Sequence, residues 1–141
     1  MEKPARILYL IARLNIGGPA IQVITLSSSR LGDRYETLLV CGGLNPGEGD
    51  MSYLAVEQGI QPYVIKAIQR KISLFGDLRS LWVIRKIIKR FQPQIIHTHT
   101  AKAGTLGRVA ALTIGIPFLS ARKFRLCTHF TAIFFIVILI A

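Results

Sequence analysis

The stretch RILYLIARLNIGGPAIQVITL, residues 6–26, carries the plainest fold signal of the chain. Its first part, Arg6–Ala12, is an apolar run of the length expected for a strand buried on both faces. A glycine pair follows, and apolar residues then recur at helical spacing over 19–31. The residues predicted on the inward side of this helix are Ala20, Val23, Ile24, Ser27 and Leu31. A buried strand, a glycine turn and a helix in this order predict one unit of a parallel sheet.

The rest of the chain repeats this rhythm. Further strands are predicted at 36–43, 61–66 and 94–100, with IPFLS, 116–120, opening another. Helices are predicted at 51–59, 75–91 and 103–115, the last capped by Gly115. The long helix over 75–91 ends before Pro93, which cannot continue a helix. Its predicted inward residues are Leu78, Leu81, Ile84, Ile88 and Phe91.

Strands that alternate with helices predict an α/β fold, with a doubly wound, mostly parallel sheet covered on both faces, which is a Rossmann-like architecture. The 141 residues suffice for one core. Eighteen basic and seven acidic residues give a net charge of +11, which favours an anionic partner such as a nucleotide phosphate or a lipid headgroup. Cys41 and Cys127 lie far apart and no signal peptide opens the sequence, so both are expected to be reduced, buried thiols of a cytoplasmic protein.

In sheets of this kind ligands bind at the carboxyl ends of the strands. The first such loop, Leu14–Ala20, contains Gly17 and Gly18, which let the backbone approach a ligand just before a helix N-terminus that favours anions. A plain tight turn is the alternative. No third glycine and no acid at the end of the second strand complete a dinucleotide fingerprint, which argues against an oxidoreductase. The second loop, 41–50, is predicted to be a mobile surface loop, and acceptor contact is the alternative.

The stretch HTHTAKAG, residues 97–104, ends the fourth predicted strand. Alternation along a strand places His97 and His99 on one face and Thr98 on the other. No third ligand accompanies the two imidazoles at a suitable spacing, so no metal is predicted. His97 is expected to be hydrogen-bonded inside the fold, and His99, nearer the strand tip, is the better ligand candidate. Lys102 is available to neutralise an anion.

The solvent side of the long helix is expected to be strongly basic. A solvated helix face is one interpretation, and docking on an anionic bilayer is the other. Nucleic acid is not a predicted partner, because no recognition module accompanies the charge. The residues concerned are Arg79, Arg85, Lys86, Lys89 and Arg90.

Taken together, four segments resemble the amino-terminal domain of family-4 glycosyltransferases, the retaining GT-B enzymes. They are RILYLIARLNIGGPAIQVITL, YETLLVCGG, GIQPYVIK and DLRSLWVIRKIIKRFQPQIIHTHTAKAGTLGRVAALTIGIP. The resemblance implies two Rossmann-like domains across a cleft, of which the first holds the acceptor and the second a nucleotide-diphosphate sugar. This sugar is a substrate, and the resemblance implies neither a cofactor nor a metal. By the same resemblance Gly17 and Gly18 approach the donor diphosphate, while the cleft is lined by Asn15, His99, Thr100, Lys102 and Gly104.

The resemblance ends at about Pro117, so the chain is divided into a domain over 1–117 and a tail over 118–141. Members of the family continue with a histidine-containing strand end and a carboxyl-terminal donor domain, and His129 does not match that pattern. The tail ends in sixteen residues without Lys, Arg, Asp or Glu, 126–141, preceded by basic residues. A membrane anchor is one interpretation, although a span needs ~20 apolar residues. A frameshifted or truncated gene, which would leave an aggregation-prone end, is the other.

These observations predict a fragment of a glycosyltransferase that moves a sugar from a nucleotide-diphosphate donor to a lipid-linked or cell-envelope glycan acceptor. The protein is expected in the cytoplasm, at the periphery of the inner membrane face. Without the donor domain the chain is expected to be inactive alone. The alternative is a non-catalytic, membrane-associated binding module. Transfer by the chain alone and together with a donor domain distinguishes the two.

Overall fold

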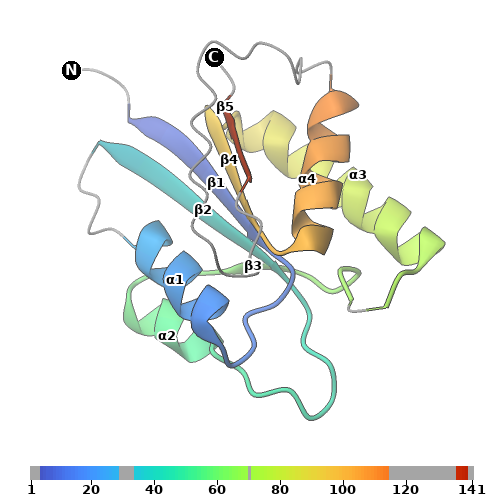
Figure 1. Cartoon of the computed structure of the whole chain (residues 1–141). Coiled ribbons are helices and arrows are strands. Elements are labelled where there is room, and N and C mark those ends of the chain that lie inside the picture. Colours follow the sequence, from blue (N-terminus) through green and yellow to red (C-terminus); the bar gives the residue numbers. More distant parts are fainter. Residues whose placement is uncertain (1–3, 29–33, 70, 115–135, 140–141) are drawn as a thin grey trace.

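The computed structural model describes residues 4–28, 34–69, 71–114 and 136–139. Four strands of one sheet, in the order β3-β2-β1-β4, run parallel, and β5 pairs with β4 in the antiparallel direction (Figure 1). The elements are β1 (Ala5–Ile11), α1 (Gly18–Ser27), β2 (Tyr35–Gly42), α2 (Ser52–Glu57), β3 (Tyr63–Ile65), α3 (Leu74–Phe91), β4 (Ile95–His99), α4 (Ala101–Leu112) and β5 (Ile136–Leu139). The predicted α/β, doubly wound architecture is confirmed.

Helices cover both faces of the sheet, with α1 and α2 on one side and α3 and α4 on the other (Figure 1). The strand β1 shows why its sequence reads as a continuous apolar run. Leu8 and Leu10 belong to the core under α3 and α4, whereas Tyr9 and Ile11 belong to the core under α1 and α2. Both sets are buried, so every position of this strand from Ile7 onward is inside the protein.

The helix α1 buries the residues predicted for its inward side, Ala20, Val23, Ile24 and Ser27, while Leu31 lies outside the described residues. For α3 the prediction is confirmed for Ile84 and Ile88, which are buried, and for Leu81 and Phe91, which pack against the core in part. It is wrong for Leu78, which is 66% exposed. The buried row is Ser80, Ile84 and Ile88, and Leu78 lies about 200° around the helix from Ser80.

Ser80 takes an inward position without a polar cost, because its hydroxyl donates a hydrogen bond of 2.7 Å to the Gly76 carbonyl. The helix begins after Ser73, whose hydroxyl accepts from the Gly76 amide. It ends at Phe91, followed by Gln92 in the left-handed region (φ 49°) and then by Pro93. Polar patterning and proline therefore fix both ends of α3 close to the predicted range.

Part of the tail joins the sheet. Residues 136–139 form β5, in which Ile138 lies opposite Ile96 of β4. The proposed domain boundary after Pro117, together with Gly115, 116–120, Cys127 and His129, lies outside the described residues. In the described part of the chain, no helix has both the length and the apolar character needed to cross a bilayer.

Cys41, at the carboxyl end of β2, is a buried free thiol, as predicted. Burial, with a smaller contribution from the Asp50 carboxylate, raises its pKa to about 12. A thiol with this pKa is almost wholly protonated near neutral pH and is a poor nucleophile. Cys41 is therefore a packing residue of the core under α1 and α2.

Candidate functional site

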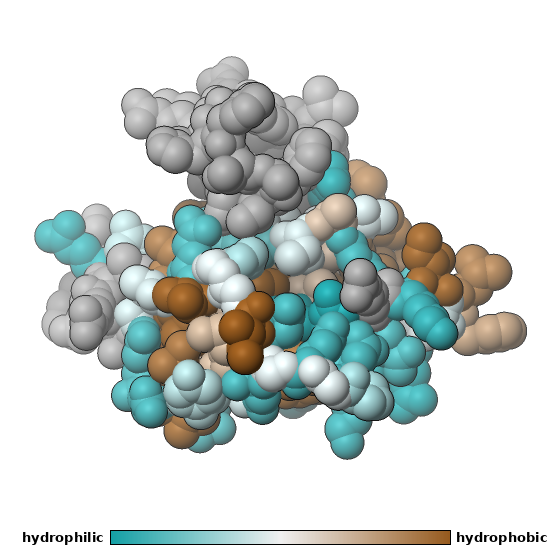
Figure 2. Space-filling view, turned by 60° about the horizontal axis from the view of Figure 1, so that its bottom comes forward, coloured by the Kyte–Doolittle hydropathy of each residue, from teal (hydrophilic) through white to brown (hydrophobic). Residues whose placement is uncertain are grey.

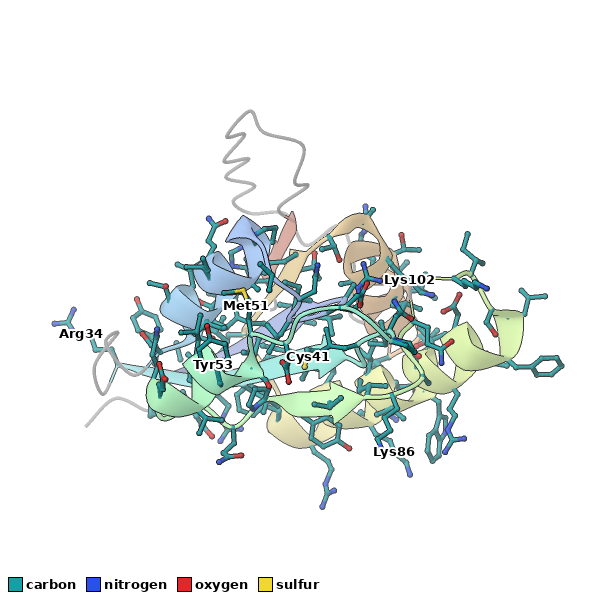
Figure 3. All side chains as sticks on the ribbon, turned by 90° about the horizontal axis from the view of Figure 1, so that it is seen from below. Arg34, Cys41, Met51, Tyr53, Lys86 and Lys102 are labelled. Atoms are coloured by element: carbon teal, nitrogen blue, oxygen red, sulfur yellow. The ribbon has the colours of Figure 1, made fainter. Side chains whose placement is uncertain are left out.

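The candidate site lies where the parallel strands end. Ile11 is level with Cys41 on one side and with His99 on the other, so β1, β2 and β4 reach the same edge. The chain leaves β1 toward α1 on one face and leaves β4 toward α4 on the opposite face. Figure 3 looks onto this edge and shows Met51 and Lys102 on the two sides of the sheet. Open α/β sheets bind ligands at a reversal of this kind, outside the carboxyl ends of the strands, and this region is here called the crevice.

The glycine turn forms the β1 side of this crevice. Gly17 precedes α1 in an extended conformation, and its amide donates a hydrogen bond of 3.4 Å to the Met51 sulfur. Gly18 begins the helix, and a Cβ placed on it would find no atom within 4 Å. Gly18 is also outside the left-handed region, so the one local restriction on a larger residue there is the ring of the following Pro19. The turn is open at Gly18, as a site for a closely approaching ligand must be.

At the start of α1, some backbone amides are hydrogen-bonded within the protein and one faces open space. The amides of Ala20 and Ile21 bond to the Gly17 carbonyl at 3.2 and 3.4 Å, and Pro19 has no N–H. The first residue of an α-helix has no partner for its amide within the helix. The Gly18 amide is thus the donor that the turn offers to an anion, at the positive end of the α1 dipole.

The loop predicted as a mobile surface loop, 41–50, lies along the glycine turn. The Ile16 amide donates to the Gly49 carbonyl at 3.2 Å, and the Met51 amide donates to the Leu14 carbonyl at 2.9 Å. Asn15, predicted to line the cleft, is half-buried and forms a β-bridge with Asp50. These contacts join the two loops into one wall at the sheet edge.

An ion pair inside this wall was missed by the sequence reasoning. The Arg13 Nη1 lies 3.2 Å from the Glu48 Oε1, and both side chains are 19% exposed. The second Glu48 oxygen accepts from the Asn45 amide at 2.9 Å. The available signal was a single arginine in the otherwise apolar run before the glycines. Arg13 and Glu48 therefore hold the second loop against the first.

The two histidines of β4 share one face of the sheet, as predicted. Their ring centroids are 4.5 Å apart, and Tyr9 of β1 lies 5.4 Å from the His97 ring. His99 is completely buried, and burial, with a smaller effect of His97, lowers its pKa to about 3. Burial also lowers the pKa of His97. Both imidazoles are neutral near pH 7, and His99 lies beneath the edge, so its contact with a ligand stays a prediction.

The stability of the protein should depend on His99 between pH 6.5 and about 3. Above pH 6.5 the imidazole is neutral in both folded and unfolded chains. As the pH falls below 6.5, the unfolded chain takes up a proton that the folded protein excludes until about pH 3, and the free energy of unfolding decreases. The contribution reaches at most about 1.4 kcal/mol per pH unit.

Urea unfolding of the parent and of His99→Gln, measured at intervals from pH 7 to pH 4.5, checks this. The variant should lose the histidine contribution, so that its stability falls less steeply as the pH is lowered. Titration of the carboxylates is common to both proteins and cancels in the difference. Equal slopes would show that His99 is protonated in the folded state.

The start of α4 forms the β4 side of the crevice. Thr100, which precedes the helix, has a φ of 81°, an uncommon conformation for a β-branched residue. Its Oγ1 is buried and makes no hydrogen bond in the part of the chain that the structure describes. Strained residues of this kind are concentrated at functional sites. Its backbone strain and its buried hydroxyl make Thr100 a candidate site residue at the carboxyl end of β4.

Lys102 and Gly104 make contacts inside the protein. The Lys102 ammonium lies 2.7 Å from the Asp77 Oδ1 and donates to the Gln69 and Lys71 carbonyls at 2.7 Å each. It joins α4 to the start of α3, and a ligand would compete with these acceptors. Gly104 is buried, and a Cβ there would lie 3.5 Å from the Thr98 Oγ1, so it packs α4 on β4. Lys102 and Gly104 therefore contact other segments of the protein, and the structure does not present them to a ligand in the crevice.

Comparisons with known proteins agree with the α/β fold described above. A family model described as a glycosyl transferase 4-like domain matches residues 17–124, more than half of the chain. A UDP-Gal:alpha-D-GlcNAc-diphosphoundecaprenol alpha-1,3-galactosyltransferase of Escherichia coli is 30% identical over 99 residues, which are 69% of this chain and 24% of that protein.

Among solved structures, MurG of Acinetobacter baumannii has the same fold, with a TM-score of 0.57 and 18% identity over 81% of this chain and 33% of MurG. The chain thus spans about a quarter of the curated relative and a third of the structural neighbour. The fold, the open glycine turn and the family match lead to one conclusion. The chain belongs to the glycosyl transferase 4-like family, with the Rossmann-like fold of a GT-B amino-terminal domain.

Proposed function

We propose that this chain forms the acceptor-side half of a glycosyltransferase that moves a sugar from a nucleotide-diphosphate donor to a lipid-linked acceptor. The family match supports sugar transfer. The Escherichia coli relative is named for a UDP-sugar donor and a diphosphoundecaprenol-linked acceptor. This chain corresponds to about a quarter of that relative. We therefore propose that a separate donor-binding domain completes the site.

The open turn at Gly18 is the observation that carries the proposal. When the bond between the sugar and the diphosphate breaks, negative charge develops on the departing phosphate oxygens. A backbone amide at a helix N-terminus stabilises such charge, and the missing side chain lets the phosphate come close. In this role Gly17 supports the turn through its bond to Met51, and Gly18 contacts the donor.

The acceptor occupies the crevice between the glycine turn and the start of α4 in this proposal. Asn15 and Thr100 line it from the two sides, and the buried His99 supports its floor. Lys102 and Gly104 hold α4 in place behind them. The proposed reaction uses no cofactor and no metal ion from this domain.

The proposed place of the reaction is the cytoplasmic face of the membrane, where the protein is peripheral. Five basic side chains on the outer side of α3 are exposed and suit an anionic lipid surface. They are Arg79, Arg85, Lys86, Lys89 and Arg90.

The test mixes the full chain with the separately produced carboxyl-terminal domain of the Escherichia coli relative, and also joins the two in one polypeptide. Transfer of labelled galactose from UDP-galactose to diphosphoundecaprenol-linked GlcNAc is measured. The relative's own amino-terminal domain, supplied in the same way, is the positive control. We expect transfer with both domains present and none with this chain alone.

If the control restores transfer and this chain does not, in either form, the proposal is wrong. Vesicle binding without transfer would then favour a non-catalytic, membrane-associated module. Because the relative's carboxyl-terminal domain supplies the donor pocket, the assay tests the acceptor-side role of this chain. The donor sugar of this protein itself is identified by a comparison of different nucleotide sugars.

A further inference from the structure

Strand β1 has an arginine near each end, and each arginine forms an ion pair with a glutamate. Near the start, the Arg6 Nε donates a hydrogen bond of 2.9 Å to the Glu36 Oε2, and its Nη1 donates one of 3.0 Å to the Phe91 carbonyl. Just beyond the end of the strand, the Arg13 Nη1 lies 3.2 Å from the Glu48 Oε1. The two ion pairs consist of the same residue types but differ in their hydrogen bonds.

The Arg13 guanidinium is satisfied only in part. Its Nε and Nη1 are buried, and neither makes a hydrogen bond within the residues that the structure describes. The contact with Glu48 is therefore an attraction between charges, in which the Nη1 hydrogens are not directed at the carboxylate oxygen. Buried donors without an acceptor cost free energy, and charged donors cost more than neutral ones. The donors of Arg13 are thus suited to an acceptor that a ligand supplies.

These donors belong to the edge at which the parallel strands end. Ile11 and His99 are level across β1 and β4, and Arg13 and Thr100 follow them by two residues and by one. The Thr100 Oγ1 is a second buried atom at this edge that has no hydrogen bond in the described part of the chain. Figure 2 brings this lower end of Figure 1 forward and shows hydrophilic side chains over much of it. Open α/β sheets bind their ligands at this edge.

A tight turn presents the Glu48 carboxylate to Arg13. Residues 45–48 have proline in the second position and glycine in the third, and Gly47 has a φ of 84°, which is the pattern of a type II turn. The Glu48 amide donates to the Asn45 carbonyl at 3.1 Å, and the Asn45 amide donates to the Glu48 Oε2 at 2.9 Å. The turn therefore holds its own shape and can move away from Arg13 as one unit.

The Glu48 carboxylate occupies the position of an anionic ligand beside the guanidinium. Arginine binds carboxylates and phosphates with the same planar set of donors. A phosphate brings more acceptor oxygens than the single contact of Glu48 and can satisfy the Nε and Nη1 donors of Arg13. Because both nitrogens are buried, a ligand reaches them only when a neighbouring segment moves. The ion pair identifies the turn of Glu48 as that segment.

We propose that the Arg13 guanidinium is a phosphate-binding group that exchanges the Glu48 carboxylate for a phosphate of a substrate. The turn over 45–48 moves away with Glu48 when the phosphate binds and returns when the phosphate leaves. The phosphate belongs to the diphosphate of the nucleotide sugar or to that of the lipid-linked acceptor. This choice of ligand rests on the proposed function, whereas the exchange itself depends only on Arg13 and Glu48.

The exchange is measured first in the parent chain. The full chain is labelled with ¹⁵N and titrated with inorganic diphosphate. The Nε–H signals of Arg13 and Arg6 are identified by their loss in Arg13→Lys and Arg6→Lys. We expect the Arg13 signal to move as diphosphate binds and the Arg6 signal to stay in place, because the Arg6 Nε is already bonded to Glu36. An Arg13 signal that does not move, or that moves no further than the Arg6 signal, overturns the proposal.

Charge-matched variants separate the exchange from general attraction of an anion to a chain of charge +11. Glu48→Gln removes the competing carboxylate and should tighten diphosphate binding about tenfold, the factor of one charge-assisted contact. Arg13→Gln should weaken binding about tenfold or more for the same reason. Glu36→Gln and Arg6→Gln make the same changes of charge at the other pair and should alter binding less than about twofold in salt. Unchanged or weaker binding by a folded Glu48→Gln protein would mean that Glu48 only supports the structure, and the exchange would be rejected.

The source of the phosphate is found by the same titration with UDP and with a short-chain prenyl diphosphate. The compound that moves the Arg13 signal at the lower concentration identifies the donor or the acceptor. Thermal melting verifies that every variant is folded, and sugar transfer with the donor domain is measured in parallel. Transfer by the parent with an Arg13 signal that no diphosphate moves would reject the exchange and retain the proposed function. Exchange at Arg13 without transfer would do the reverse.

Discussion

Gly42→Ala is expected to destabilise the protein by about 4 kcal/mol, which is enough to unfold a domain of ordinary stability in large part. A Cβ on Gly42 would lie 2.3 Å from the Ala12 carbonyl oxygen and 2.5 Å from the Ile68 carbonyl oxygen. Both are backbone atoms, and the Ala12 oxygen also accepts the Gly42 amide at 3.0 Å. Relief of the clash therefore requires β1, β2 and the segment after β3 to separate.

The neighbouring glycine supplies the control. A Cβ on Gly43 would lie 3.6 Å from the Lys66 Cα, which is an ordinary contact. Gly43→Ala should therefore change the free energy of unfolding by less than about 1 kcal/mol, and restriction of the unfolded chain makes a small gain the expected sign. Urea unfolding of the parent and both variants measures the difference. Similar midpoints for the two alanine variants would mean that β2 does not end against the Ala12 and Ile68 carbonyls.

The glycine pair at 42–43 also shows how far sequence reasoning reaches. That a strand ends there follows from turn chemistry, and the observed end at Gly42 agrees with it. Which of the two glycines is indispensable depends on the distance to Ala12 and Ile68, residues that are remote in sequence. The spacing of apolar residues identifies helices and strands. How much a single residue contributes to the free energy of unfolding depends on contacts between those helices and strands.

The same distinction explains the error at Leu78. An apolar residue near the start of an amphipathic helix is normally assigned to the inner side. Here Ser80 lies inward because its hydroxyl is satisfied by the Gly76 carbonyl, and the apolar side chains before it point to solvent. Local pattern cannot show that the first turns of α3 have no sheet beneath them. The result is an exposed apolar cluster at the start of α3.

At the candidate site, the sequence predicted which segments lie close together. It did not predict the ion pairs and hydrogen bonds that join these segments. Parallel strands separated by helices bring the glycine turn and the HTHTAKAG segment to one edge. The ion pair of Arg13 with Glu48 and the three contacts of Lys102 join segments that no spacing rule connects. The β5 strand was missed for a related reason. Its β-branched run signals a strand, but pairing with β4 depends on an open sheet edge.

Gly18→Val should reduce sugar transfer by about a hundredfold in a protein that still folds, because a displaced reacting group alone can cost a factor of this size. A Cβ on Gly18 would meet no atom of another segment within 4 Å, and the isopropyl group would extend into the open space beside the Gly18 amide. The diphosphate would then be held away from the amide and from the positive end of α1. The Cβ of valine also meets the ring of Pro19, because the helical conformation is disfavoured for a residue before proline, and a moderate loss of stability is therefore expected as well.

Gln22→Val is the matched control, because Gln22 is exposed on the same helix and receives the same side chain. Transfer is measured with the donor domain present, and thermal unfolding is measured for the parent and both variants. The proposal requires that only Gly18→Val lose transfer and that all three proteins are folded at the assay temperature. Full activity of a folded Gly18→Val protein would place the donor elsewhere, because a phosphate in contact with that amide leaves no room for a branched side chain. Loss of transfer by a folded Gly18→Val protein, with Gln22→Val fully active, supports a donor diphosphate in the space at Gly18, at a site shared between two domains.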